Sequence, residues 1–250
     1  MKTLKITEMT WEEVAAAMSD GFDTVLFALG STEQHGPALP EHTDTLEAEY
    51  IANRLALRLD KTLQGPTVNL GCSDHHLSFP GTISLRKETL QAILTDYVSS
   101  LAHHGFKKIL IIPFHGGNFA PTEAILPSLR ERYPEIEILA YTDLLEVEKC
   151  LGDSGTSLGY TKEEIGGHAD AWESSAMLYL DEEHVHRELF TSGYRGEIGE
   201  KELARLFREG MTSLTENGIL GDSRRAQKED GKALLDLFVE FLYEKIRVIS

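Results

Sequence analysis

The sequence predicts an α/β fold with a largely parallel sheet. Short apolar runs alternate along the chain with longer stretches of helical periodicity, the order typical of parallel strands joined by crossover helices. The 250 residues fit one large α/β core. No repeat, low-complexity tract or Pro/Ser-rich linker divides the chain, so we expect a single domain over residues 1–250.

The first half of the chain contains two predicted strands and two predicted helices. Residues 24–29, Thr-Val-Leu-Phe-Ala-Leu, form an unbroken apolar run that ends at Gly30, which predicts a buried strand. Apolar residues at helical spacing predict a helix over residues 45–59. Residues 67–70 are predicted to form a second short strand, and residues 87–104 a second helix.

The second half repeats this alternation. Residues 107–112, Lys-Lys-Ile-Leu-Ile-Ile, give the clearest strand signal, and a helix is expected from Pro121 to residue 132. Residues 136–141 predict a fourth strand, and we interpret residues 150–167 as an irregular insertion or lid. The remaining helical stretches are 171–180, which also fits a buried strand, 198–208, and the long amphipathic 228–246.

Charge and cysteine content limit the partners and the compartment. The chain has 24 Lys and Arg against 41 Asp and Glu, a net charge of −17. Such a surface repels phosphate backbones and anionic lipids, so we expect no nucleic-acid or membrane partner. The two cysteines, Cys72 and Cys150, cannot form a disulfide framework, and no signal-peptide core or membrane span is evident. We therefore expect a cytoplasmic protein that acts on a small molecule.

Polar clusters follow the predicted strands, where ligands bind in open α/β sheets. The clusters occupy residues 30–45, 115–118 and 166–173. The first two supply two carboxylates and two imidazoles: Glu33, His35, Asp44 and His115. This donor set suits Zn²⁺, Mn²⁺ or Fe²⁺, and a bridging carboxylate would allow two ions. We expect Gly116 and Gly117 to let the backbone pass close to the metal or substrate.

Each cluster also has a purely structural interpretation. Asp44 could cap the helix that follows it, with Glu47 completing a capping box. Asp170 and Glu173 have the same D-x-x-E spacing, and there a structural cap is our default interpretation. Residues 115–118, His-Gly-Gly-Asn, could form only a tight turn.

Five blocks of sequence, taken together, resemble the creatininase (creatinine amidohydrolase) family. The blocks are Gly-Ser-Thr-Glu-Gln-His-Gly-Pro at 30–37, Thr-Asp-Thr at 43–45, Phe-Pro-Gly-Thr at 79–82, His-Gly-Gly-Asn at 115–118 and His-x4-Glu-Ser-Ser at 168–175. The resemblance implies a three-layer α/β/α sandwich and a metal-dependent hydrolase of non-peptide C–N bonds, often a homohexamer built from dimers.

The resemblance also assigns residues. It places Glu33, His35, Asp44 and His115 on metal-ligand positions. Asp44 takes the bridging position of two-metal members and His168 the position of the catalytic histidine. Glu173 takes an acidic position beside the metal, where we expect it either to act in catalysis by orienting His168 or to complete the metal shell. We further expect His75 to line the pocket and Asp170 to contact substrate.

The positions at which this sequence differs from creatininase itself argue against creatinine as the substrate. At the position of Gly117, creatininase has a glutamate that ligates the second metal. It also has a glutamate immediately before the catalytic histidine, at the position of Gly167, and a tryptophan that closes over the substrate approximately at the position of Glu164. Either Glu173 replaces the lost ligand or the protein uses one metal. The His-Gly-Gly-Asn version is that of the broader family, which includes a formamide-cleaving deformylase and a peptidase-like maturation protein.

These observations predict a hydrolase of a small cyclic amide or formamide. A metal-activated water would attack, and His168 would carry its proton to the leaving nitrogen. The alternatives are a peptidase-like maturation factor and a non-catalytic metal-binding member of the family. The sequence has no G-x-S-x-G, P-loop, G-x-G-x-x-G or HExxH motif, which disfavours serine hydrolases, phosphate-binding enzymes and zincins.

Overall fold

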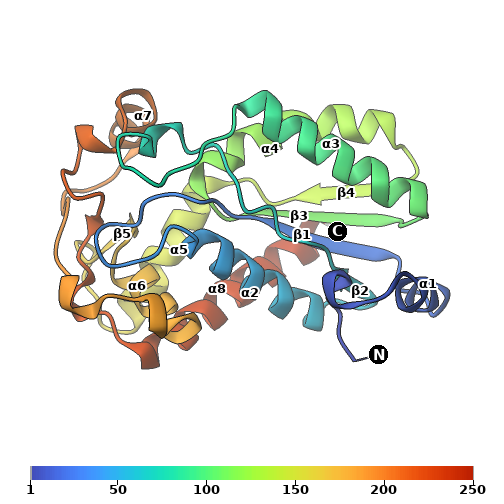
Figure 1. Cartoon of the computed structure of the whole chain (residues 1–250), viewed down its shortest axis with the longest axis horizontal. Helices are drawn as coiled ribbons and strands as arrows, with labels where there is room; N and C mark the ends of the chain where they lie inside the picture. Colours follow the sequence, from blue (N-terminus) through green and yellow to red (C-terminus); the bar gives the residue numbers. More distant parts are fainter. Residues whose placement is uncertain (1, 250) are drawn as a thin grey trace.

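The protein is built on a parallel four-stranded sheet. The computed structural model describes residues 2–249. The strands are β1 (Thr24–Leu29), β2 (Thr62–Gln64), β3 (Lys108–Pro113) and β4 (Glu137–Ala140), in the order β2-β1-β3-β4. All three strand pairs are parallel. The predicted α/β fold is confirmed, and the carboxyl ends of the strands meet at one end of the molecule (Figure 1).

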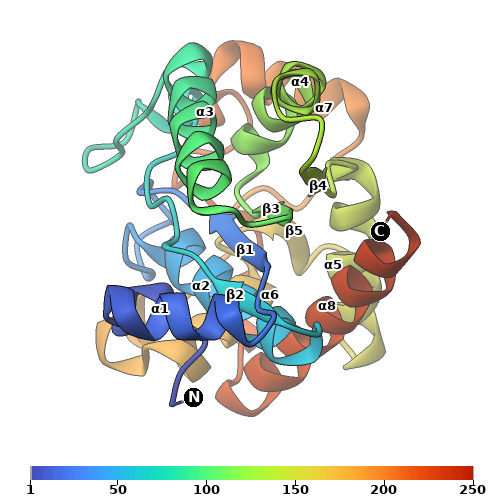
Figure 2. The ribbon, with the colours of Figure 1, turned by 90° about the vertical axis from the view of Figure 1, so that its right-hand side faces the viewer.

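Helices cover both faces of this sheet. The α-helices of the described chain are α1 (Trp11–Ser19), α2 (Thr43–Arg58), α3 (Lys87–His104), α4 (Gly116–Arg132), α5 (Leu144–Ser157), α6 (Ala171–Leu180), α7 (Glu200–Glu209) and α8 (Lys228–Ile249). Seen along the sheet, α3 and α4 lie on one side and α2 and α8 on the other (Figure 2). This is the three-layer arrangement that the family resemblance implies.

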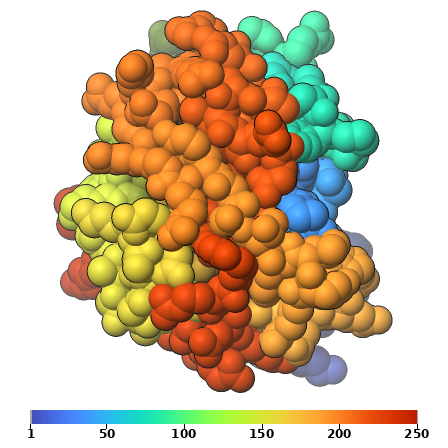
Figure 3. All heavy atoms as spheres, turned by 90° about the vertical axis from the view of Figure 1, so that its left-hand side faces the viewer, coloured from blue at the N-terminus to red at the C-terminus, as the bar shows by residue number. Residues whose placement is uncertain are grey.

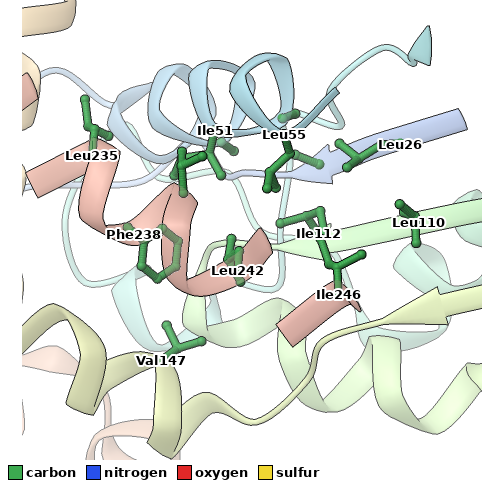
Figure 4. Packing of buried hydrophobic residues seen from close by; sticks show 14 of the residues in the cluster. Leu26, Ile51, Leu55, Leu110, Ile112, Val147, Leu235, Phe238, Leu242 and Ile246 are labelled. Atoms are coloured by element: carbon green, nitrogen blue, oxygen red, sulfur yellow. The ribbon is translucent and has the colours of Figure 1, made fainter. Parts of the chain in front are cut away.

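The two faces separate because successive strand residues point in opposite directions. Leu26 and Leu110 face α2 and α8, where Phe238 is one of the largest fully enclosed side chains (Figure 4). Phe27 and Ile109 face α3 and α4. Both central strands are therefore buried on both sides, which is why they are continuous apolar runs in the sequence.

A small second sheet lies beyond the carboxyl ends of the main strands. β5 (Ile165–His168) pairs antiparallel with β6 (Leu220–Gly221). Gly166 approaches the backbone of Leu220 so closely that a Cβ would lie 2.4 Å from the Leu220 carbonyl. This sheet places His168 at the end of β5, directly before α6.

Several predicted elements are confirmed and others are wrong. The strand at 24–29 and the helix at 87–104 form as predicted, and 171–180 is a helix. The strand predicted at 67–70 is wrong, because the second strand is β2 and Val68 makes only an isolated bridge to β1. The interpretation of 150–167 as irregular holds only for residues 158–164, because 150–157 belong to α5, which packs against α8 and β5, and 165–167 belong to β5.

The predicted helix at 121–132 begins five residues earlier, at Gly116, as α4. The short connection from β3 to α4 keeps His115 at the carboxyl end of β3. None of the helices within residues 2–249 combines the length and the apolar character needed to span a lipid bilayer.

Candidate metal centre

The four predicted ligand residues converge at the carboxyl ends of the two central strands. β1 leads into the loop that carries Glu33 and His35, β3 leads directly into His115, and Asp44 lies in the first turn of α2. All four side chains are buried. Because β1 and β3 are neighbours in the sheet, residues separated by up to 82 positions of sequence, Glu33 to His115, meet in one cluster.

The His-Gly-Gly-Asn motif anchors this end of the sheet. His115 is the N-cap residue of α4, so the motif is a helix start rather than the tight turn of the structural interpretation. The Asn118 side-chain amide donates to the Gly30 carbonyl at 2.9 Å, and its oxygen accepts from the Cys72 amide at 3.0 Å. A Cβ on Gly117 would lie 2.0 Å from the Cys72 carbonyl oxygen, so only glycine fits there.

One group of ligand atoms surrounds Glu33. Its Oε1 lies 3.2 Å from His115 Nδ1 and 3.3 Å from His76 Nε2, and His115 Nδ1 lies 3.4 Å from Asp44 Oδ2. The Ser31 hydroxyl donates to the same Asp44 oxygen at 2.5 Å and fixes its orientation. We call Glu33, His115 and Asp44 the first cluster.

A second group surrounds His35. Its Nε2 lies 3.3 Å from Asp44 Oδ1 and 3.7 Å from Glu173 Oε2. Glu47 offers a further carboxylate oxygen within 4.8 Å of the oxygens of Asp44 and Glu173. We call His35, Asp44, Glu173 and Glu47 the second cluster. Asp44 therefore presents one oxygen to each cluster, the arrangement of a bridging carboxylate.

The ring nitrogens of both histidines are arranged as in metal ligands. His35 Nδ1–H donates to the Glu33 carbonyl at 2.9 Å, and His115 Nε2–H donates to the Cys72 carbonyl at 3.2 Å. A backbone carbonyl can only accept, so the opposite nitrogen of each neutral ring is free of a proton and faces the carboxylates. Ligating histidines use this arrangement to orient the ring.

The donor atoms also fit an ion in spacing and in their lack of partners. Ligands at about 2.0–2.2 Å from a tetrahedral ion lie roughly 3.3–3.6 Å from each other. The contacts of His35 and His115 with Glu33, Asp44 and Glu173 measure 3.2–3.7 Å. Within residues 2–249, several of these atoms are buried without a hydrogen-bond partner: both carboxylate oxygens of Glu33, both of Glu47, and His35 Nε2. Buried polar atoms are normally paired, so these atoms fit a cation site.

Without an ion, the pKa values of the histidines and carboxylates in the centre are shifted far from their ordinary values. Burial alone would lower the pKa of His35 and of His115, but the surrounding carboxylates hold both values well above normal. Burial raises the pKa of Glu173 and of Glu47 well above the ordinary value. The carboxylates thus draw protons to the histidines and to each other, which a divalent cation would make unnecessary.

His168 lies close to both clusters. Its ring is 4.3 Å from that of His35 and 4.6 Å from that of His76. Its Nε2–H donates to the Gln34 carbonyl at 2.8 Å, which leaves Nδ1 as the free acceptor. Burial, followed by the neighbouring His35, lowers the pKa of His168 well below normal and keeps the ring neutral.

The two acidic residues of the D-x-x-E segment, Asp170 and Glu173, have different roles. Asp170 is the N-cap of α6: its Oδ1 accepts from the Trp172 and Glu173 amides at 2.7 and 3.1 Å, and its Oδ2 from the Gly166 and Gly167 amides, each at 2.9 Å. These bonds favour the structural cap over the predicted substrate contact. Glu173 instead points into the second cluster and accepts from the amide after His168.

A pocket opens from the metal centre to the surface. Its polar floor contains His75 and Gly116, as predicted for substrate-binding residues, whereas Gly117 and Asp170 are not among the described residues that line it. Its apolar walls come from α5 and α7: Leu144, Val147, Leu151, Leu203, Leu206 and Phe207. Figure 3 looks onto this end, where the orange segment with α7 lies beside the yellow segment with α5. The predicted lid at 150–167 therefore forms part of one wall, and α7 supplies the other.

Two residues of the centre, Glu47 and His76, lie outside the predicted ligand set. The capping-box interpretation of Asp44 and Glu47 is wrong, because α2 begins at Thr43 with His42 as its N-cap. The signal for the role of Glu47 was its spacing, because residues three apart share one face of a helix. His76 directly follows His75 and has no ligand signal of its own in the sequence. It contacts Glu33, and the Gln34 amide donates to its Nδ1 at 2.9 Å.

Comparison with known proteins agrees with this geometry. The family model Creatininase, "Creatinine amidohydrolase", matches residues 7–246. The "Mycofactocin precursor peptide peptidase" of Mycobacterium tuberculosis is 30% identical over 226 residues, 87% of this chain and 82% of the relative. The creatinine amidohydrolase of Pseudomonas putida is 26% identical over 261 residues, 98% of this chain and 97% of the relative. The solved structure "Creatininase Mn" superposes with a TM-score of 0.75 at 22% identity over 98% of each chain. The chain therefore belongs to the creatininase family.

Proposed function

We propose that this protein is a metal-dependent hydrolase that cleaves a non-peptide C–N bond in a small cyclic amide or formamide. The observation that carries the proposal is a buried group of carboxylates and imidazoles, in which the oxygens of Glu33 and Glu47 and Nε2 of His35 have no hydrogen-bond partner among residues 2–249. Glu33, Asp44, His115 and Glu173 of this group line the pocket. Such donors accept Zn²⁺, Mn²⁺ or Fe²⁺. Glu33, His115 and Asp44 would hold an ion in the first cluster.

When bound, a divalent ion supplies Lewis-acid chemistry: it makes water more acidic and polarises an amide carbonyl. The protein must then move one proton, because an amide nitrogen leaves poorly unless it is protonated. His168 is neutral and its free Nδ1 can take a proton from water and return it to the leaving nitrogen. The hydrogen bond from His168 Nε2 to the Gln34 carbonyl holds the ring in that orientation.

A second candidate function is cleavage of a peptide. It is supported by the relative named as a peptide peptidase and by a groove that adjoins the pocket. Glu148, Gly167 and Ile198 line both the pocket and this outer groove, which continues past Lys149 and Arg195 at the surface. An extended substrate could pass from the groove to the metal centre, as a peptide requires.

A hydrolysis screen of the metal-loaded protein separates these possibilities. Lactams, hydantoins, formamides and creatinine form one panel and short peptides another, with His168→Ala as the matched inactive control. Turnover confined to the first panel supports the proposal, and turnover of peptides alone favours the second candidate. Bound metal without turnover in either panel would favour a non-catalytic member. Purified protein that neither contains nor takes up a divalent metal would refute the scheme.

We also propose the homo-oligomeric assembly that the family resemblance implies. Light scattering coupled to size-exclusion chromatography measures its mass directly. A monomer near 27.9 kDa would contradict this proposal.

A further inference from the structure

The structure contains a buried carboxyl group, that of Glu47, with which no lysine or arginine of residues 2–249 forms an ion pair. Glu47 is completely enclosed, and within residues 2–249 neither of its carboxylate oxygens has a hydrogen-bond partner. It lies one helical turn after Asp44 on α2, so both side chains reach the same site. An ionised carboxylate in such a position is strongly unfavourable unless a cation is present.

The surroundings of Glu47 are themselves acidic. The charged groups that act on it are the carboxylates of Glu173, Asp44 and Asp170 and the imidazole of His35. None of the ion pairs formed by the lysines and arginines of the described chain reaches Glu47. The one basic group that acts on Glu47 is the imidazole of His35. Its Nε2 lies 3.3 Å from Asp44 and 3.7 Å from Glu173 and lacks a hydrogen-bond partner of its own.

We propose that Glu47 ligates a second divalent ion, held in the second cluster together with His35, Asp44 and Glu173. This inference rests on the proposed function in that it assumes a first ion in the cluster of Glu33, His115 and Asp44. It assigns Glu47 to the metal centre and makes Asp44 the bridging ligand. The second site then has one imidazole and three carboxylates, a donor set suited to Zn²⁺ or Mn²⁺.

Charge balance favours two ions over one. The centre encloses four carboxylates: Glu33, Asp44, Glu47 and Glu173. One divalent ion offsets two negative charges and leaves two buried charges to be removed by protonation. Two divalent ions offset all four and allow the histidines to remain neutral ligands, as their hydrogen bonds to backbone carbonyls require.

Metal stoichiometry tests this inference without any substrate. Wild type and Glu47→Gln are stripped with a chelator, reloaded with Zn²⁺ or Mn²⁺ alone, desalted and measured by elemental analysis. Glutamine keeps the shape of glutamate but removes its charge, so we expect the bound metal to fall about twofold, from two ions per chain to one. Glu49→Gln is the matched control, because Glu49 lies on the same helix but pairs with Lys5 at 2.7 Å near the surface. It should retain both ions.

One bound ion in wild type, or two in a folded Glu47→Gln variant, would overturn the inference. Far-UV circular dichroism shows whether the variant folds. Should it fail to fold, crystals of metal-loaded wild type give an independent answer by anomalous scattering. Two peaks, one of them within about 2.5 Å of a Glu47 oxygen, support the inference. A single peak, or a second peak that Glu47 does not contact, contradicts it. Because no substrate is involved, a negative hydrolysis screen leaves this result unaffected.

Discussion

Replacing Asp170 with alanine should destabilise the fold rather than weaken substrate binding. The side chain accepts four backbone N–H bonds, two from the first turn of α6 and two from Gly166 and Gly167 in β5. Loss of the helix cap costs about 1 kcal/mol. The two partly buried N–H groups of β5 would lose their acceptor at about 1 kcal/mol each. We expect a total near 3 kcal/mol, which lowers the midpoint of thermal unfolding by about 6–12 °C in a chain of this length.

Thermal unfolding followed by circular dichroism measures this loss. Asp143→Ala is the matched control, because Asp143 caps α5 through a single bond from the Glu146 amide at 3.0 Å. That variant should lose only about 1 kcal/mol. If Asp170→Ala unfolds like the control and instead raises the KM several-fold with an unchanged kcat, Asp170 contacts substrate and the structural assignment fails.

Four further predictions concern the pocket and its surroundings. His168→Ala should keep its metal by elemental analysis but lose turnover on the order of 10²-fold or more, and equal turnover would exclude it as the proton carrier. Asp44→Ala should lose bound metal, since Asp44 offers an oxygen to each cluster. Full metal content in that variant would contradict the bridging role. Gly117→Ala should cost about 2–4 kcal/mol in denaturant unfolding, because its Cβ would lie 2.0 Å from the Cys72 carbonyl oxygen. Burial raises the pKa of Glu148 from 4.5 to about 8, so the folded protein keeps a proton that the unfolded chain releases, and stability falls as pH rises through that range. Glu148→Gln should flatten this fall in a pH series of unfolding midpoints, and identical curves would refute the shift.

The parts of the fold that the sequence predicts well are those whose signal is local. β1 and β3 are buried on both faces, so their apolar runs mark them directly, and the polar residues after them meet because the strands are neighbours. β2 has only three residues, Thr62–Gln64, and owes its existence to pairing with β1. β5 contains two glycines and forms only because Leu220–Gly221, far along the chain, lies beside it.

At the candidate metal centre, too, the roles of some residues could not be predicted because they depend on more than the local sequence. The D-x-x-E spacing of Asp44 and Glu47 fits a capping box and a shared helix face equally well. Only the position of the helix start, at Thr43, decides between them. For Asp170 and Glu173 the same spacing gives a real cap and, three residues later, a side chain in the second cluster. One pattern thus leads to different chemistry because the helices begin at different positions relative to it.

The hydrogen bonds of Asn118 bear on how the proposed metal centre would gain and lose its ions. Asn118 joins the end of β1 to the segment at Cys72, and Ser31 orients Asp44, all through protein atoms alone. The fold therefore fixes the positions of the ligand side chains, whether or not an ion is bound. In small zinc domains, binding and folding are one event. Here the chelated protein should stay folded and reload reversibly, so the metal present in the cell would follow supply and affinity rather than be fixed when the chain folds.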